Sequence, residues 1–133
     1  MTHLAEQTLT AFIACNSWEQ RSRLVLQAAS LLPAYPEALR TPAQLVEGCT
    51  AKVWLSVQST TPELNYLIDS ESRLLKGLLA LMHVRINGLS ASALHQLDLE
   101  QWYQQLGLKQ QLTASRANGL HTVFQQLLAH ALR

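Results

Sequence analysis

The residue best suited to chemistry in this sequence is Cys49, which directly follows Gly48. Glycine permits backbone angles that other residues avoid, and it leaves space for another molecule to approach the neighbouring sulfur. A thiolate in such a position is a strong nucleophile. The same two residues also fit a loop in which a small cysteine is simply buried. The local sequence leaves both interpretations open.

The second cysteine, Cys15, ends the apolar segment Phe12-Ile13-Ala14, and we interpret it as a packing residue. Neither cysteine belongs to a Cys-x-x-Cys pair, and no histidine cluster with ligand spacing lies beside either one. We therefore expect no metal site. A cysteine hydrolase would need a histidine folded against Cys49, and the sequence does not exclude one. The candidates are His3, His83, His95, His121 and His130.

Arg116 and Gly119 are unusual residues for the start of a helix that the sequence predicts from about residue 113 or 115. An arginine in the first turn opposes the helix dipole, and a glycine inside a helix costs about 1 kcal/mol relative to alanine. Two unfavourable residues together indicate another use for the site. A solvated Arg116 and a close helix contact at Gly119 are equally good explanations.

Acidic and hydroxyl side chains precede another predicted helix, at Asp69, Ser70 and Glu71. Acidic residues are electrostatically favoured at a helix start, and short polar side chains cap the exposed amides there. Helix capping alone therefore explains this motif. A role for Glu71 in binding a partner is the alternative.

The elements that position these residues come from a chain of 133 residues, of which 48% are hydrophobic and only 14% charged. Soluble domains usually carry roughly a quarter charged residues. The net charge of +1 argues against a strongly basic nucleic-acid-binding protein. The sequence contains no apolar run of about eighteen residues, the length needed to span a membrane. The first residues do not resemble a secretory signal. We expect a cytoplasmic protein that binds neither nucleic acid nor membrane.

Hydrophobic periodicity predicts helices on both sides of a short sheet. Residues 52–58 alternate between apolar and polar, which is typical of a strand, and residues 64–68 form a second strand after a turn at 59–62. A hairpin of two strands is marginal alone, so we expect a third strand, which residues 45–47 could supply. The predicted helices cover residues 4–14, 18–32, 42–45, 71–86, 90–97, 99–106 and the C-terminal segment. The fold class is α+β, in one domain over residues 1–133.

Three motifs in a fixed order resemble those of the SufE/CsdE family of sulfur-acceptor proteins. Residues 48–54, GCTAKVW, are similar to the family's G-C-x-x-x-V-W around its acceptor cysteine. Residues 69–71 and 76–78, DSE and KGL, are similar to D-S-D/E followed by a G-L helix. Residues 112–120, LTASRANGL, are similar to S-R-x-x-G-L. One departure is Ile68, where the family often has glycine.

The resemblance implies a fold like that of SufE and IscU proteins and a role in sulfur transfer. Cys49 would take the outer sulfur of a persulfide from a pyridoxal-phosphate-dependent cysteine desulfurase of the SufS or CsdA type. The protein would stimulate that enzyme and pass sulfur to a further acceptor or to a scaffold for iron–sulfur cluster assembly. The chain itself would be neither an enzyme nor a cofactor-binding protein, because the pyridoxal phosphate belongs to the desulfurase. Gly48, Lys52, Glu71 and Arg116 would support the loop or contact the partner.

The chemistry of Cys49 requires no neighbouring base, because part of an ordinary thiol is ionised near neutral pH. Two other functions remain as alternatives. An iron–sulfur cluster scaffold needs about three protein ligands that converge on iron. An independent thiol hydrolase would act on esters or amides without any partner. The motif variants slightly favour the CsdE-like branch, and the sequence identifies neither the desulfurase nor the final acceptor.

Overall fold

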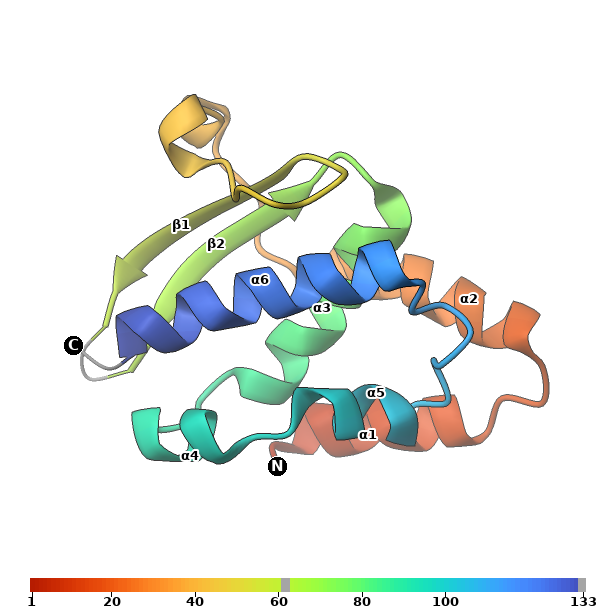
Figure 1. Cartoon of the computed structure of the whole chain (residues 1–133). Helices are drawn as coiled ribbons and strands as arrows, with labels where there is room; N and C mark the ends of the chain where they lie inside the picture. Colours follow the sequence, from red (N-terminus) through yellow and green to blue (C-terminus); the bar gives the residue numbers. More distant parts are fainter. Residues whose placement is uncertain (61–62, 132–133) are drawn as a thin grey trace.

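The structure is a computed structural model that describes residues 1–60 and 63–131. Over these residues it contains six α-helices and one antiparallel pair of strands, which confirms the α+β fold class (Figure 1). The helices are α1 (His3–Ile13), α2 (Trp18–Ala28), α3 (Arg73–Ile86), α4 (Ala91–Gln96), α5 (Leu99–Gln105) and α6 (Ala114–Ala131). The strands are β1 (Val53–Ser59) and β2 (Asn65–Ser70), and short 3₁₀ turns cover Ala29–Leu31, Glu37–Leu39 and Pro42–Gln44.

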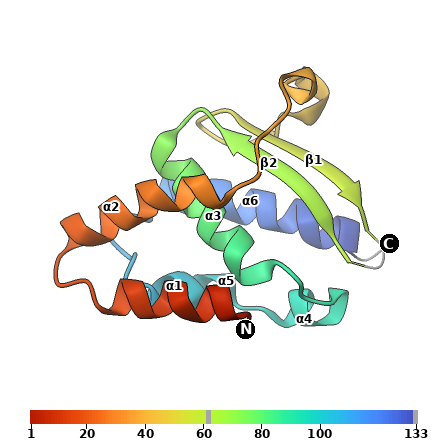
Figure 2. The same cartoon turned by 180° about the vertical axis from the view of Figure 1, so that it is seen from behind.

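Helix α3 forms the centre of the hydrophobic core. It contacts α2, β2, α1 and α6, and it is buried on nearly every side. In Figure 1 helix α6 crosses in front of α3, and in Figure 2, seen from behind, it lies beyond α3. None of the helices in the described residues is both long and apolar enough to cross a bilayer. The buried apolar side chains of α3 are Leu75, Leu78, Leu79, Ala80, Leu81, Met82, Val84 and Ile86.

The prediction of a third strand at residues 45–47 is wrong, because only one isolated bridge forms there. Leu45 forms only an isolated bridge with Trp54, and the amide of Val46 donates to the carbonyl of Val53 at 2.9 Å. A 3₁₀ turn ends at Gln44, just before this pairing, and Gly48 turns the chain with a φ of +89°, just after it. The extended segment is therefore too short to continue the ladder. Two residues of the predicted turn, 61 and 62, lie outside the described residues.

The prediction that Asp69 and Ser70 cap a helix is also wrong. Both residues belong to β2, where Ser70 pairs with Val53 and Asp69 with Trp54. Ser72 caps α3 instead, because its hydroxyl accepts a hydrogen bond from the amide of Leu75 at 3.2 Å. Helix α2 begins as predicted, with the hydroxyl of Ser17 accepting from the amide of Gln20 at 3.1 Å.

The backbones of α2 and α3 approach each other very closely at Gly77. A Cβ atom at this position would lie 2.1 Å from the carbonyl oxygen of Val25 in α2. Such a separation is far below van der Waals contact, so only glycine fits. This contact gives a structural reason for the glycine in the second sequence motif.

Candidate functional site

Cys49 lies in a loop of five residues, 47–51, which we call the Cys49 loop. Before the loop, Val46 is hydrogen-bonded to Val53, and after it β1 begins. The φ of +89° at Gly48 lies in the left-handed region, which favours glycine. No atom lies within 4 Å of a Cβ built there, so the need for glycine is conformational rather than steric.

The thiol of Cys49 is half-buried against a pocket of about 140 Å³. Its Sγ lies 3.9 Å from the carbonyl oxygen of Gly119, to which the thiol donates a weak hydrogen bond. The pocket brings together the Cys49 loop, the start of α3 and the start of α6, and with them residues from all three sequence motifs or their immediate neighbours. Its lining residues are Cys49, Thr50, Ala51, Ser72, Leu75, Ser115, Arg116 and Gly119.

Main-chain contacts fix the C-terminal side of the Cys49 loop at Lys52. The amide of Lys52 donates to Oε1 of Glu71 at 3.2 Å, and its carbonyl accepts from the amide of Glu71 at 3.2 Å. The hydroxyl of Ser70 donates to the same carbonyl at 2.9 Å. The structure therefore places Lys52 and Glu71 together through the backbone of Lys52, while both side chains are exposed.

Arg116 lies at the pocket and is turned back from α6. Its Nη1 donates to the carbonyl oxygen of Gln111 at 3.1 Å, and the residue is half-buried rather than freely solvated. Gln111 is itself buried, and its Nε2 donates to Oγ of Ser22 at 3.1 Å in α2. Nothing in the local sequence distinguishes Gln111 from the other twelve glutamines, so sequence patterns do not predict this contact.

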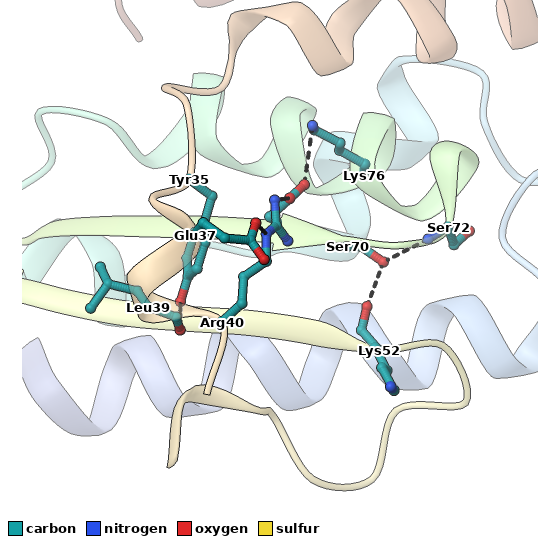
Figure 3. A network of polar contacts seen from close by, with 9 residues as sticks. Tyr35, Glu37, Leu39, Arg40, Lys52, Ser70, Ser72 and Lys76 are labelled. Carbon is teal, nitrogen blue, oxygen red and sulfur yellow. Dashed lines mark hydrogen bonds and ion pairs between the residues drawn. The ribbon is translucent and has the colours of Figure 1, made fainter. Parts of the chain in front are cut away.

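A second polar cluster, which local sequence patterns do not predict, contains Arg40, Glu37 and Lys76 around the buried carboxylate of Asp69 (Figure 3). Oδ2 of Asp69 accepts from Nη2 of Arg40 at 2.5 Å, and Nζ of Lys76 lies 3.1 Å from Oδ1. The guanidinium of Arg40 also pairs with Glu37 at 3.0 Å. Burial raises the pKa of Asp69, but hydrogen bonds from Arg40, Lys76 and the Ser70 backbone outweigh it and hold the pKa below its ordinary value.

The environment of Cys49 disfavours its thiolate. Burial raises the pKa of the Cys49 thiol above its ordinary value, because an ion is poorly solvated in the partly apolar pocket. The expectation of an ordinary thiolate fraction near neutral pH is therefore too high for the free chain. At neutral pH the thiol form dominates.

This shift predicts the pH dependence of Cys49 alkylation. In a Cys15→Ser background, the rate of reaction with iodoacetamide should rise with pH around a midpoint above that of the same chain unfolded in urea. The reason is that a raised pKa keeps the thiol protonated to higher pH, and only the thiolate reacts. A folded-state midpoint equal to or below the unfolded one would contradict the prediction.

Cys15 lies apart from the pocket residues in sequence and structure. It follows α1, is half-buried, and donates from Sγ to the carbonyl oxygen of Ala11 at 3.5 Å. The pocket lining contains neither Cys15 nor a histidine. Among residues 1–60 and 63–131, no group of three His, Cys, Asp or Glu side chains is placed to hold a metal ion.

Comparison with known proteins gives consistent matches over nearly the whole chain. A family model described as "SufE: Fe-S metabolism associated domain" matches residues 6–131. The "Sulfur acceptor protein CsdE" of Escherichia coli (strain K12) is 31% identical over 129 residues, which cover 96% of this chain and 88% of that protein. An uncharacterized SufE-like protein of Rhizobium meliloti (strain 1021) is 31% identical over 135 residues, 98% and 96% of the two chains.

A solved structure has a similar fold. The solution structure of a hypothetical protein from Thermus thermophilus matches with a TM-score of 0.75, covering 97% of this chain and 93% of that one. The two sequences are 20% identical, so this match concerns the fold alone.

Proposed function

Since the chain belongs to the SufE family, we propose that Cys49 accepts sulfur from the persulfide of a pyridoxal-phosphate-dependent cysteine desulfurase. The observation that supports this most is the half-buried thiol beside a small pocket built from three separate segments. The relative from Escherichia coli is named a sulfur acceptor protein, which agrees with the proposal. Cytoplasm is the compartment we propose, because thiols stay reduced there.

The exchange needs no external oxidant or reductant. The Cys49 thiolate attacks the outer sulfur of the partner's cysteine persulfide, and a new S–S bond forms on Cys49 as the partner's S–S bond breaks. The partner's cysteine leaves as a thiolate and takes up the proton that Cys49 releases. The outer sulfur is transferred, and the total number of S–S bonds stays the same. The pyridoxal phosphate remains with the desulfurase, and this chain needs no cofactor for the step.

The pocket offers a partly enclosed lining for the product on Cys49. Arg116 and Gly119, from the first two turns of α6, form one side of it, and the Arg116 guanidinium is bound to the carbonyl of Gln111. Leu75 and Ala51 form an apolar part of the lining. We propose that the pocket holds the outer sulfur away from water until a further acceptor or a cluster scaffold takes it.

The residues around Cys49 then have distinct roles. Gly48 supplies the turn of the loop, and Glu71 fixes its end by binding the backbone of Lys52. Arg116 lines the pocket and ties it to the segment before α6 by bonding the carbonyl of Gln111. Burial raises the pKa of Cys49 in the free chain, and we propose that docking of the desulfurase brings the thiol into an environment that favours its thiolate. Such docking is how we propose that the two proteins stimulate each other's reaction.

The direct test is to incubate the chain with a desulfurase of this type and L-cysteine, and to measure the intact mass. We expect one added sulfur atom, which peptide mapping assigns to Cys49 and which a reducing thiol removes. A chain that gains no sulfur while the desulfurase consumes cysteine would refute the proposal.

Gly119→Ala tests the space beside the thiol. A Cβ at this position would lie 3.7 Å from Sγ of Cys49 and 3.9 Å from Cδ2 of Leu75, which are ordinary contacts. We expect the free energy of unfolding to rise by up to about 1 kcal/mol, because alanine favours the helix. We also expect slower sulfur loading, because the methyl group occupies part of the pocket. Urea denaturation and the loading assay measure the two effects; faster or unchanged loading would contradict the second.

A further inference from the structure

The outgoing end of the Cys49 loop and the segment that leads into the loop both contact the C-terminal end of β2. The outgoing end of the loop is fixed because Ser70 and Glu71 bind the backbone of Lys52. Its incoming end continues a segment of ten residues, 37–46, which we call the incoming arm. The arm runs from one 3₁₀ turn through a second to the isolated bridge at Leu45.

Arg40 provides the main side-chain attachment of the incoming arm. It bonds Asp69, the residue that directly precedes Ser70 and Glu71. Its guanidinium carbon also lies 4.9 Å from the ring centroid of Trp54 and 5.3 Å from that of Tyr35. The hydroxyl of Tyr35 donates to the carbonyl of Leu39 at 3.1 Å, which closes the turn that presents Arg40.

Few hydrogen bonds attach the arm to the sheet. In the part of the chain that the structure describes, they are the Arg40–Asp69 bond and the backbone bond from Val46 to Val53. The Asp69 side chain is 7% exposed, whereas that of Glu37 is 90% exposed. The bond to Asp69 is therefore protected from solvent, and the bond to Glu37 is not. Charge-assisted bonds of the protected kind contribute most to local rigidity.

We propose that Arg40 and Asp69 are positioning residues that hold the Cys49 loop closed over its pocket. Asp69 binds the incoming arm, and the next two residues bind the outgoing end, so one short stretch at the end of β2 contacts the segments on both sides of the loop. When Arg40 releases Asp69, the backbone contacts that still hold the incoming arm to the sheet, among the residues the structure describes, are the short bridge at Leu45 and the bond from Val46 to Val53. The loop then opens more often, and the thiol becomes accessible. The relevance of such opening to sulfur transfer rests on the proposed function, but the opening itself does not.

Accessibility of the thiol can be measured in the chain alone. In a Cys15→Ser background at fixed pH, we compare iodoacetamide alkylation of Cys49 in three versions of the chain: Arg40 intact, Arg40→Met and Arg40→Lys. Methionine keeps an apolar side chain of similar length over Trp54 but cannot bond Asp69. We expect Arg40→Met to be alkylated about tenfold faster. Arg40→Lys keeps one cationic donor, so its rate should lie between the other two.

Arg85→Met is the matched control. The Arg85 guanidinium also stacks on a tryptophan, at 5.9 Å from the ring centroid of Trp102, but it lies towards the other end of α3. This variant should leave the alkylation rate unchanged. Urea denaturation of every variant gives the share of alkylation that global unfolding explains. Faster hydrogen exchange at the amide of Val46 in Arg40→Met would locate the opening in the incoming arm.

Two results would overturn the proposal. One is an alkylation rate of Arg40→Met that equals the rate with Arg40 intact. An increase in that rate that global unfolding, measured by urea denaturation, explains in full counts as the same result. The other is an Arg40→Lys rate equal to the Arg40→Met rate, since the ionic bond would then have no effect. If Arg40→Met does not fold, the alkylation rate of Arg40→Lys is compared with the rate of the chain in which Arg40 is intact. Equal rates in these two chains would contradict the proposal. The assay uses no desulfurase, so failure of sulfur loading would leave its outcome unaffected.

Discussion

Cys49→Ser protein is expected to gain no sulfur from a desulfurase and to leave the rate of that enzyme unstimulated. A serine hydroxyl of similar size keeps the loop and pocket intact, but it is not ionised near neutral pH and forms no persulfide. The loss should be complete rather than partial, because no other thiol lines the pocket. Intact mass after incubation with desulfurase and L-cysteine, together with the rate of alanine release, measures both effects.

Cys15→Ser is the control for this experiment, since it removes the chain's other cysteine. It should accept sulfur at nearly the rate of the unaltered chain, because Cys15 follows α1 and contacts the Ala11 carbonyl rather than the pocket. Stable sulfur on the Cys49→Ser chain, or loss of loading in Cys15→Ser, would show that the acceptor is not Cys49 alone.

Gly77→Ala should lower the free energy of unfolding strongly, because a Cβ at Gly77 makes the shortest contact among the five glycines. The added Cβ would lie 2.1 Å from the carbonyl oxygen and 2.8 Å from the carbonyl carbon of Val25. These are backbone atoms, so relief requires α2 and α3 to move apart. We expect the free energy of unfolding to fall by about 3 kcal/mol, because overpacking exceeds the gain of about 1 kcal/mol in helix propensity. Urea denaturation measures the change.

Gly119→Ala is the matched control, because it also adds a methyl group to a buried glycine within a helix. There the nearest atoms lie at ordinary contact distances, so the same substitution should stabilise the chain slightly. A fall in the free energy of unfolding for Gly77→Ala and a rise for Gly119→Ala would support the close approach of α2 and α3 at Gly77. A Gly77→Ala chain as stable as the unaltered one would show that the two helices are not so close.

The order and type of the elements were predictable from local patterns. Alternation marked β1, and the spacing of apolar residues marked the long helices, because both patterns depend on which faces are buried. The third strand and the cap of α3 were not predictable in this way. Asp69 lies in β2 opposite Trp54, and its carboxylate binds Arg40, 29 residues earlier in the chain. No local pattern reports a contact over that separation.

The candidate site shows the same limit. Cys49, Arg116 and Gly119 stood out because each residue type is unusual in its local context, and all three line one pocket. Glu71 stood out for a different reason, as a helix cap, whereas its carboxylate binds the backbone of Lys52. Gln111 and Arg40 are ordinary in their local sequence, and only their long-range partners make them important.

The short span of the Cys49 loop limits how the sulfur can be delivered. Cys49 is three residues from Val46 and three from Lys52, both of which are hydrogen-bonded to the sheet or its end. An extended chain covers about 3.3–3.6 Å per residue, so the Cα of Cys49 can move no farther than about 10 Å from either fixed residue. Such a short tether excludes delivery by a long swinging arm. Under the proposed function, a sulfur donor must therefore bring its persulfide to the surface of this chain, within reach of the short loop.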